Sequence, residues 1–198
     1  MRALTIMLGL VLLPGHALAQ FGNPAGWAPD SRTDAPGKPA PNQTNYQDRL
    51  FAQLVTAGGL AEVELGRLAA GKSTNDEVKA FADRMVGDHT DANAKLKAIA
   101  DKSRMPLPDR LDPDHEKMRA DLEKLDGARF DLEYMKAQVI DHQKTVQLLV
   151  WEIGLGQDAE VQQFAKETLP KVLEHLEMAR QIQAQLADDA RVRPAGTK

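Results

Sequence analysis

The sequence of 198 residues contains no cysteine, and this absence excludes several kinds of site. A disulfide framework, a thiolate zinc site and a cysteine nucleophile all need the missing sulfur. Any metal ion that the chain binds must therefore be held by histidine, aspartate or glutamate side chains. No Ser-His-Asp arrangement and no phosphate-binding loop stands out either, so the sequence offers no recognised catalytic motif.

Aromatic residues are also scarce, and basic charge is not in excess. Aromatics make up 5% of the chain and hydrophobic residues 42%, while helix-favouring Ala, Leu, Lys, Glu and Gln occur throughout. This composition predicts one all-helical domain. The formal net charge of -4 argues against nucleic acid as a partner, because a non-specific binder needs a basic face to displace counterions.

The chain begins with its longest apolar run, MRALTIMLGLVLLPGHALAQ. An apolar stretch at residues 3–13 precedes an Ala-Leu-Ala cleavage pattern at residues 17–19, so residues 1–19 are predicted to be a secretory signal peptide. The run is shorter than the ~20 residues that cross a bilayer, so we expect a periplasmic or secreted protein with no transmembrane segment in its mature form. Residues 20–45 are rich in Pro and Gly without an apolar period, which predicts a disordered linker.

From Tyr46 onward apolar residues recur with the period of a helix. Four long helices are predicted, at about residues 46–70, 74–102, 128–153 and 158–187. Short links join the first helix to the second and the third to the fourth, whereas residues 103–127 form a longer crossover. This pattern predicts an all-α fold, an antiparallel four-helix bundle over residues 46–188, followed by a flexible tail at residues 189–198.

Local signals predict where several of these helices begin and end. Thr74 and Glu77 have the spacing of a capping box at the start of the second helix. Asp112-Pro113 is expected to open a short extra helix in the crossover between helices two and three, and Gly127 to end it. Asp158 can cap the last long helix.

Three histidines lie in the apolar stripes of three different helices. His89, His142 and His175 follow the three- and four-residue steps that face a bundle core, so they are predicted to point inward at similar heights. On the first helix Glu62 is the carboxylate expected to point inward, because Glu64 lies on the nearly opposite face. Two interpretations stay open at this stage. The histidines either hydrogen-bond to one another in the core or share a metal ion.

The residues around the histidines bear on the identity of a metal. A ferritin-type di-iron site needs Glu-x-x-His, and valine stands three residues before each of these histidines. Three imidazoles with one carboxylate better suit a single zinc, copper or iron ion, or no metal. The candidate metal ligands are Glu62, His89, His142 and His175.

An acidic residue directly precedes each of the three histidines. These residues are Asp88, Asp141 and Glu174. They lie roughly 100° around the helix from the histidines, so they flank the core. They are expected either to hydrogen-bond to the imidazoles from outside or to lie on a solvated face.

Other side chains are predicted to have structural roles. His115, on the crossover, is expected at the surface. The methionines at helical spacing are expected to fill the core, with a copper-binding methionine cluster as the alternative. These are Met85, Met118, Met135 and Met178.

Four separated blocks, GGLAEVELGRLAA, EVKAFADRMVGDHTDAN, LDGARFDLEYMKAQVIDHQKTVQLL and FAKETLPKVLEHLEMA, resemble in this order an exported bacterial family known as domain of unknown function 4142. The resemblance covers about residues 46–183 and implies a ferritin-like four-helix bundle without an established activity. The family pattern has an acidic position matching Glu62 and histidines matching His89, His142 and His175.

Two functions are compatible with these observations. The first is an exported helical bundle that binds a metal ion in envelope metal handling or stress protection. The second is a non-catalytic envelope or stress protein without a metal, whose core histidines satisfy one another and whose linker meets a partner. Enzymatic redox chemistry at the metal is a third hypothesis with less support. The partners implied are a metal ion, an envelope protein or a second copy of the chain.

Overall fold

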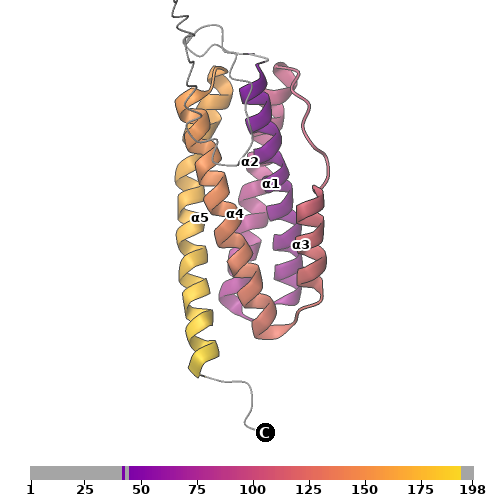
Figure 1. Cartoon of the computed structure of the whole chain (residues 1–198), viewed down its shortest axis with the longest axis vertical. Coiled ribbons are helices and arrows are strands. Elements are labelled where there is room, and N and C mark those ends of the chain that lie inside the picture. Colours follow the sequence, from indigo (N-terminus) through magenta and orange to yellow (C-terminus); the bar gives the residue numbers. More distant parts are fainter. Residues whose placement is uncertain (1–41, 43–44, 193–198) are drawn as a thin grey trace, which may run out of the picture.

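The computed structural model describes Asn42 and residues 45–192, and five helices are described in this part. They are α1 (Tyr46–Lys72), α2 (Asp76–Lys102), α3 (Pro113–Glu123), α4 (Gly127–Leu155) and α5 (Ala159–Val192). Four of them, α1, α2, α4 and α5, run along one another as an antiparallel bundle, and α3 lies beside it (Figure 1). The predicted all-α, ferritin-like four-helix bundle with a short extra helix in the crossover is confirmed.

The bundle consists of two helical hairpins, α1 with α2 and α4 with α5. Glycines in α1 allow the first pair to approach closely. A Cβ atom on Gly66 would lie 2.9 Å from Cγ2 of Val86 and 3.0 Å from the backbone oxygen of Ala82. A Cβ atom on Gly59 would lie 2.1 Å from Oδ1 of Asn93. A larger side chain at position 66 would push α1 and α2 apart, whereas one at position 59 would displace the Asn93 side chain.

Two predictions about helix ends were wrong. Asn75 rather than Thr74 caps α2, and its side chain accepts hydrogen bonds from the backbone N–H groups of Glu77 and Val78. The N-cap therefore lies one residue later than predicted, and asparagine is a strong N-cap residue. Gly127 begins α4 instead of ending α3, with φ of 55°, in the left-handed region that favours glycine.

Two other caps agree with the predictions. The Asp112 side chain accepts hydrogen bonds from the first N–H groups of α3, with Pro113 at the first helical position. The Asp158 side chain accepts from the N–H groups of Glu160 and Val161 at the start of α5. Short polar side chains at these positions satisfy amide groups that have no partner within the helix.

The described residues cover part of the predicted C-terminal tail but not the predicted signal peptide. The helix α5 continues to Val192, so the first residues of the predicted tail at 189–198 are helical. The predicted signal peptide at residues 1–19 and nearly all of the linker at 20–45 lie outside the described residues. Within the part that the structure describes, no helix is both long and apolar enough to cross a membrane.

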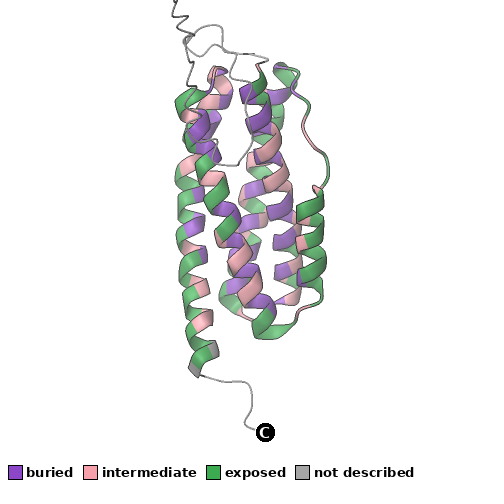
Figure 2. Cartoon of the chain, viewed as in Figure 1, coloured by how far each residue is buried: buried purple, intermediate pink, exposed green. Residues whose placement is uncertain are grey.

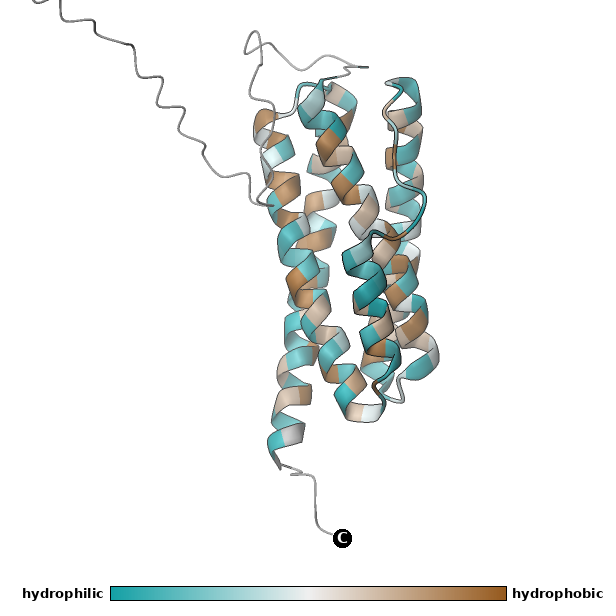
Figure 3. Ribbon diagram, turned by 45° about the vertical axis from the view of Figure 1, so that its right-hand side comes forward, coloured by the Kyte–Doolittle hydropathy of each residue, from teal (hydrophilic) through white to brown (hydrophobic). Residues whose placement is uncertain are grey.

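Buried residues line the inward faces of the bundle and form two apolar clusters (Figures 2 and 3). One cluster includes Phe51 and Leu149, and the other includes Leu65 and Phe130. The predicted core role of the methionines holds, since two are fully buried and two pack partly buried against the second cluster. Along α2, α4 and α5, residues of one cluster precede each of the three histidines and residues of the other follow it. The histidine level therefore separates the two apolar clusters.

Candidate metal centre

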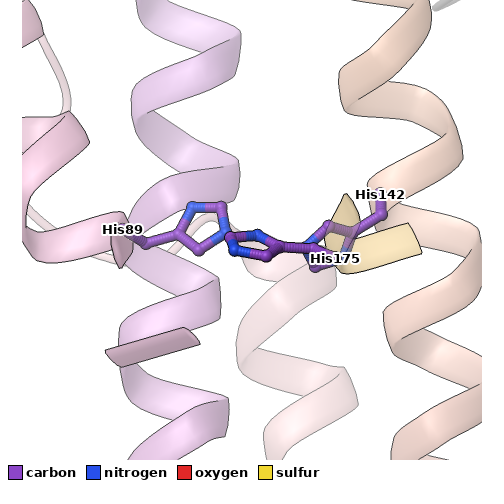
Figure 4. A group of neighbouring side chains, drawn as sticks. All are labelled: His89, His142 and His175. Carbon is purple, nitrogen blue, oxygen red and sulfur yellow. The ribbon is translucent and has the colours of Figure 1, made fainter. Parts of the chain in front are cut away.

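His89 in α2, His142 in α4 and His175 in α5 meet inside the bundle, and their rings point toward one another (Figure 4). The ring centroids are 5.6 Å apart for His89 and His142, 5.6 Å for His89 and His175, and 5.5 Å for His142 and His175. The most exposed of the three, His89, has a relative exposure of 8%. One possible ligand atom of each ring lies within 4.8 Å of the other two.

Hydrogen bonds fix which nitrogen carries the proton in two of the rings. His142 Nδ1 lies 2.9 Å from the backbone oxygen of Gln138, and His175 Nε2 lies 2.8 Å from Oδ2 of Asp88. Because both partners are acceptors, these two nitrogens donate. Their second nitrogens, His142 Nε2 and His175 Nδ1, are then left with lone pairs that can bind a metal.

One nitrogen in each ring is buried and has no hydrogen-bond partner in the described chain. These nitrogens are His89 Nε2, His142 Nε2 and His175 Nδ1. An unpaired buried polar atom costs about 1–3 kcal/mol of stability. Three such atoms at one place call for a ligand or a compensating interaction.

The three imidazoles are neutral at pH 7. Burial and the neighbouring histidines lower the pKa of His89 to about 3. Burial lowers the pKa of His175 to about 4, although its hydrogen bond to Asp88 acts in the opposite direction. Burial also lowers the pKa of His142. Neutral imidazole is the form that binds metal ions, so no proton has to be removed first.

A metal ion would need a small contraction of this group. Zinc–nitrogen bonds are about 2.0–2.1 Å long, so two ligand nitrogens in a tetrahedral site lie roughly 3.3 Å apart. The present limit of 4.8 Å therefore requires the rings to move inward by about 1 Å. Three protein ligands leave a fourth position for water or another small ligand.

Glu62 in α1 lies at the same level but behind His142. Its Oε1 atom is 3.6 Å from His142 Nδ1, the nitrogen that donates to Gln138, and its Oε2 atom has no hydrogen bond from a described residue. Burial raises the pKa of Glu62 to about 8, and the charge of Asp141 adds to this increase. The group of possible ligand atoms consists of the three histidines without Glu62. As a fourth ligand Glu62 would have to rotate toward the centre.

Asp88 is the one acidic neighbour that hydrogen-bonds to an imidazole of the group. Besides His175 it binds Lys171 at 2.8 Å and Arg84 at 3.3 Å. Burial opposes its ionisation, but the hydrogen bonds from Lys171 and His175 lower its pKa to about 2. Asp88 is thus a charged acceptor that holds His175 with Nδ1 toward the centre.

Asp141 and Glu174 have other partners. Oδ2 of Asp141 faces His115 Nε2 at 3.7 Å and Oδ1 binds Lys144 at 3.0 Å, while Glu174 pairs with Arg84 at 2.9 Å on the exposed surface. The predicted surface position of His115 was wrong, because α3 folds back against α4 and half-buries this ring. The facing Asp141 carboxylate, together with Asp112, whose Oδ2 lies 2.5 Å from His115 Nδ1, raises the pKa of His115 to about 9, so the contact with Asp141 is an ion pair at neutral pH.

The sequence reasoning missed Gln138, which is fully buried beside the centre. Its backbone oxygen accepts from His142, and its side-chain amide favours the ionised form of Glu62 without making a hydrogen bond of good geometry. Its position four residues before His142, one helical turn away on the same face, is the signal that could have identified it.

Comparisons with known proteins place the fold and the family. The structure resembles the crystal structure of a DUF305 fragment from Deinococcus radiodurans, with a TM-score of 0.63 and 15% sequence identity over 74% of this chain and 99% of that chain. At this identity the likeness concerns the fold alone. A search of curated proteins found no match. The sequence pattern of the domain of unknown function DUF4142 matches residues 33–182, and the chain therefore belongs to the DUF4142 family.

Proposed function

We propose that this domain binds one transition-metal ion, zinc, copper or iron, through His89, His142 and His175. The observation that carries the proposal is the meeting of three neutral, buried imidazoles, each with one unpartnered nitrogen, within 4.8 Å of one another. The absence of cysteine excludes thiolate ligands, and imidazole suits all three of these metals. For a given set of such ligands, copper(II) is expected to bind more tightly than zinc or iron(II).

Mutual hydrogen bonding would leave the group unsatisfied. The unpartnered nitrogens of His142 and His175 are acceptors, because the other nitrogen of each ring donates elsewhere. Only His89 could supply a proton to the group, and one N–H donor cannot satisfy two acceptors with two good hydrogen bonds. A cation bound by all three lone pairs would satisfy every nitrogen at once.

The biological role follows from the open coordination and the predicted export. An ion held by three protein ligands can exchange through its fourth position, which suits binding and release in metal handling or stress protection. The cell envelope or exterior is the location that the predicted signal peptide at residues 1–19 implies. Glu62 in α1, the one long helix that contributes no histidine, remains a candidate fourth ligand.

Metal content and metal-dependent stability test this proposal. Protein purified without a histidine tag is expected to bind one zinc or copper ion per chain in calorimetry, and an ion at 100 times its Kd should stabilise the fold by about 2.7 kcal/mol. His142→Leu should abolish both effects, and His115→Gln, which changes a histidine outside the group, should preserve them. If zinc, copper and iron all leave the melting temperature of the parent unchanged, the non-catalytic interaction protein becomes the better hypothesis.

A further inference from the structure

The short helix α3 lies along the outside of the bundle, where it contacts both α1 and α4 (Figures 1 and 3). Of its eleven residues Leu122 alone is buried, and Met118 packs partly buried against the core. Its remaining attachments are polar. His115 pairs with Asp141 of α4, and Arg119 lies 3.9 Å from Glu64 of α1. A helix with so little buried apolar surface can open at a lower free energy than the four long helices.

Beneath α3 lies a group of buried polar atoms. Glu62 Oε2, Asp141 Oδ2 and both side-chain amide atoms of Gln138 have no hydrogen-bond partner in the part of the chain that is described. These groups lead inward from His115, which is 3.7 Å from Asp141, to Glu62, which is 3.6 Å from His142. Buried polar and carboxyl side chains of this kind disfavour a cation less than an apolar core does.

Other side chains cover the three histidines along the bundle axis and at the α2–α5 seam. The two apolar clusters fill the bundle on either side of the histidine level. The seam between α2 and α5 carries a row of ion pairs at 2.8–3.2 Å. These pairs are Arg84–Glu174, Asp88–Lys171, Lys95–Glu167 and Lys102–Glu160. Beneath α3, by contrast, the buried side chains are polar and the covering helix itself has one buried residue, Leu122.

We propose that α3 is a lid over the α1–α4 seam, with His115 as its latch, and that its opening controls how fast a metal ion reaches and leaves the three histidines. This inference rests on the proposed metal-binding function and concerns the rate of exchange rather than the affinity. The covering contacts all come from the crossover, so the four long helices need not separate when the lid opens.

The experiment uses the lack of cysteine in the chain. The double variant Glu64→Cys, Arg119→Cys is joined across the α1–α3 contact by a short bis-maleimide cross-linker, and the same variant with both thiols capped by N-ethylmaleimide is the matched control. Each protein is loaded with zinc and mixed with a chromogenic chelator. Zinc release should be at least tenfold slower in the cross-linked protein, while the Kd for zinc should stay within about twofold.

Two single variants complete the design. His115→Gln breaks the latch and should release zinc several-fold faster than the parent at an unchanged Kd. Lys95→Gln breaks an ion pair on the α2–α5 seam and should leave the release rate unchanged. Equal rates with and without the cross-linker would overturn the lid and leave the proposed function intact. Failure of the parent to bind zinc would count against both.

Discussion

Polar side chains are buried both in the middle and at one end of the bundle. Those at the end have hydrogen-bond partners, whereas the histidines in the middle each have an unpartnered nitrogen. At the end, Asp48 of α1 accepts hydrogen bonds from the backbone N–H groups of Gln157 at 2.9 Å and Asp158 at 2.5 Å. Ser103 donates to Asp158 at 3.1 Å. In the middle, three ring nitrogens face one another without a donor. Backbone donors make the end a structural tie between α1 and the α4–α5 turn, whereas the middle is arranged to receive a ligand.

The two regions also differ in how they hold protons. Glu152, next to Asp48, is fully buried, and burial together with the Asp48 charge raises its pKa to about 9. It therefore keeps its proton at pH 7 and can donate it to Asp48. A Cβ atom at position 156 would lie 2.1 Å from Glu152 Oε1, which explains the glycine there. Glu152 is an acid held in its neutral form, whereas the three histidines of the middle are bases held in their neutral form, so Glu152 and the histidines should respond to pH with opposite signs.

The largest expected effect is the decrease in the free energy of unfolding that the buried histidines cause in the metal-free protein when the pH falls. The pKa is about 3 for His89 and about 4 for His175, against about 6.5 when unfolded. At these two sites the unfolded state therefore binds more protons as pH falls below 6.5, so both histidines lower the stability. Each should contribute a loss of about 2 kcal/mol by pH 5, or about 4 kcal/mol together. Glu62 and Glu152, with raised pKa values, act in the opposite direction, so the histidine share is the difference between the parent and a variant without these histidines in urea unfolding at pH 7 and pH 5.

The control for this prediction replaces all three histidines of the centre by leucine. This variant should become more stable relative to the parent by about 4 kcal/mol between pH 7 and pH 5, because it lacks the imidazoles, whereas Glu62 and Glu152 are present in both proteins and cancel in the comparison. Parallel pH profiles for the two proteins would show that the rings are not held neutral in one buried group.

Asp48→Ala tests the structural tie at the end of the bundle. The change leaves the N–H groups of Gln157 and Asp158 without their carboxylate acceptor, and each unpaired buried donor costs about 1–3 kcal/mol. We expect a loss of about 3 kcal/mol in urea unfolding. Asp101→Ala, which removes a surface ion pair with Lys97, should cost less than about 0.5 kcal/mol. A similar cost for both variants would contradict a special role for Asp48.

Asp88→Asn tests whether a carboxylate supports the centre from outside. The amide oxygen is a weaker acceptor for His175 Nε2, so zinc affinity should fall roughly 10–100-fold, which corresponds to about 1.4–2.7 kcal/mol. Glu174→Gln removes a charge from the same surface without touching an imidazole and should change the affinity by less than about twofold. Calorimetric titration of both variants with zinc measures this difference. Equal zinc affinities would show that the Asp88 carboxylate does not strengthen zinc binding through His175.

The smallest effect should appear at alkaline pH. The raised pKa of Glu152 means that the folded state binds more protons than the unfolded state between the ordinary value of 4.5 and about 9, so stability falls as pH rises through this range. The parent should lose about 1.4 kcal/mol from pH 7 to pH 8 through this group. Glu152→Gln should remove this part of the slope. Glu62, with the same sign, is present in both proteins, so their difference reports Glu152.

The sequence predicted most of the fold because its signals are local. Apolar spacing located the four long helices, and Asp112 and Asp158 capped the helices assigned to them. The errors lay at helix ends. The cap of α2 is displaced by one residue to Asn75, where adjacent polar residues compete for one cap, whereas Gly127 begins α4 and α5 continues to Val192. The same helical period placed His89 and His142 on inward faces, since a side chain on an apolar stripe must face the core.

The tertiary structure decided what each buried side chain meets, because such contacts depend on how the helices are aligned along one another. Asp48 and Gln157 are 109 residues apart, and no local pattern joins them. The position of Glu62 behind His142 rather than beside the ring nitrogens likewise depends on the alignment of α1 with α4. The ion pair of His115 with Asp141 depends on where the crossover returns to the bundle. Helical periodicity determines which face a residue occupies, and only packing determines its neighbours across the interface.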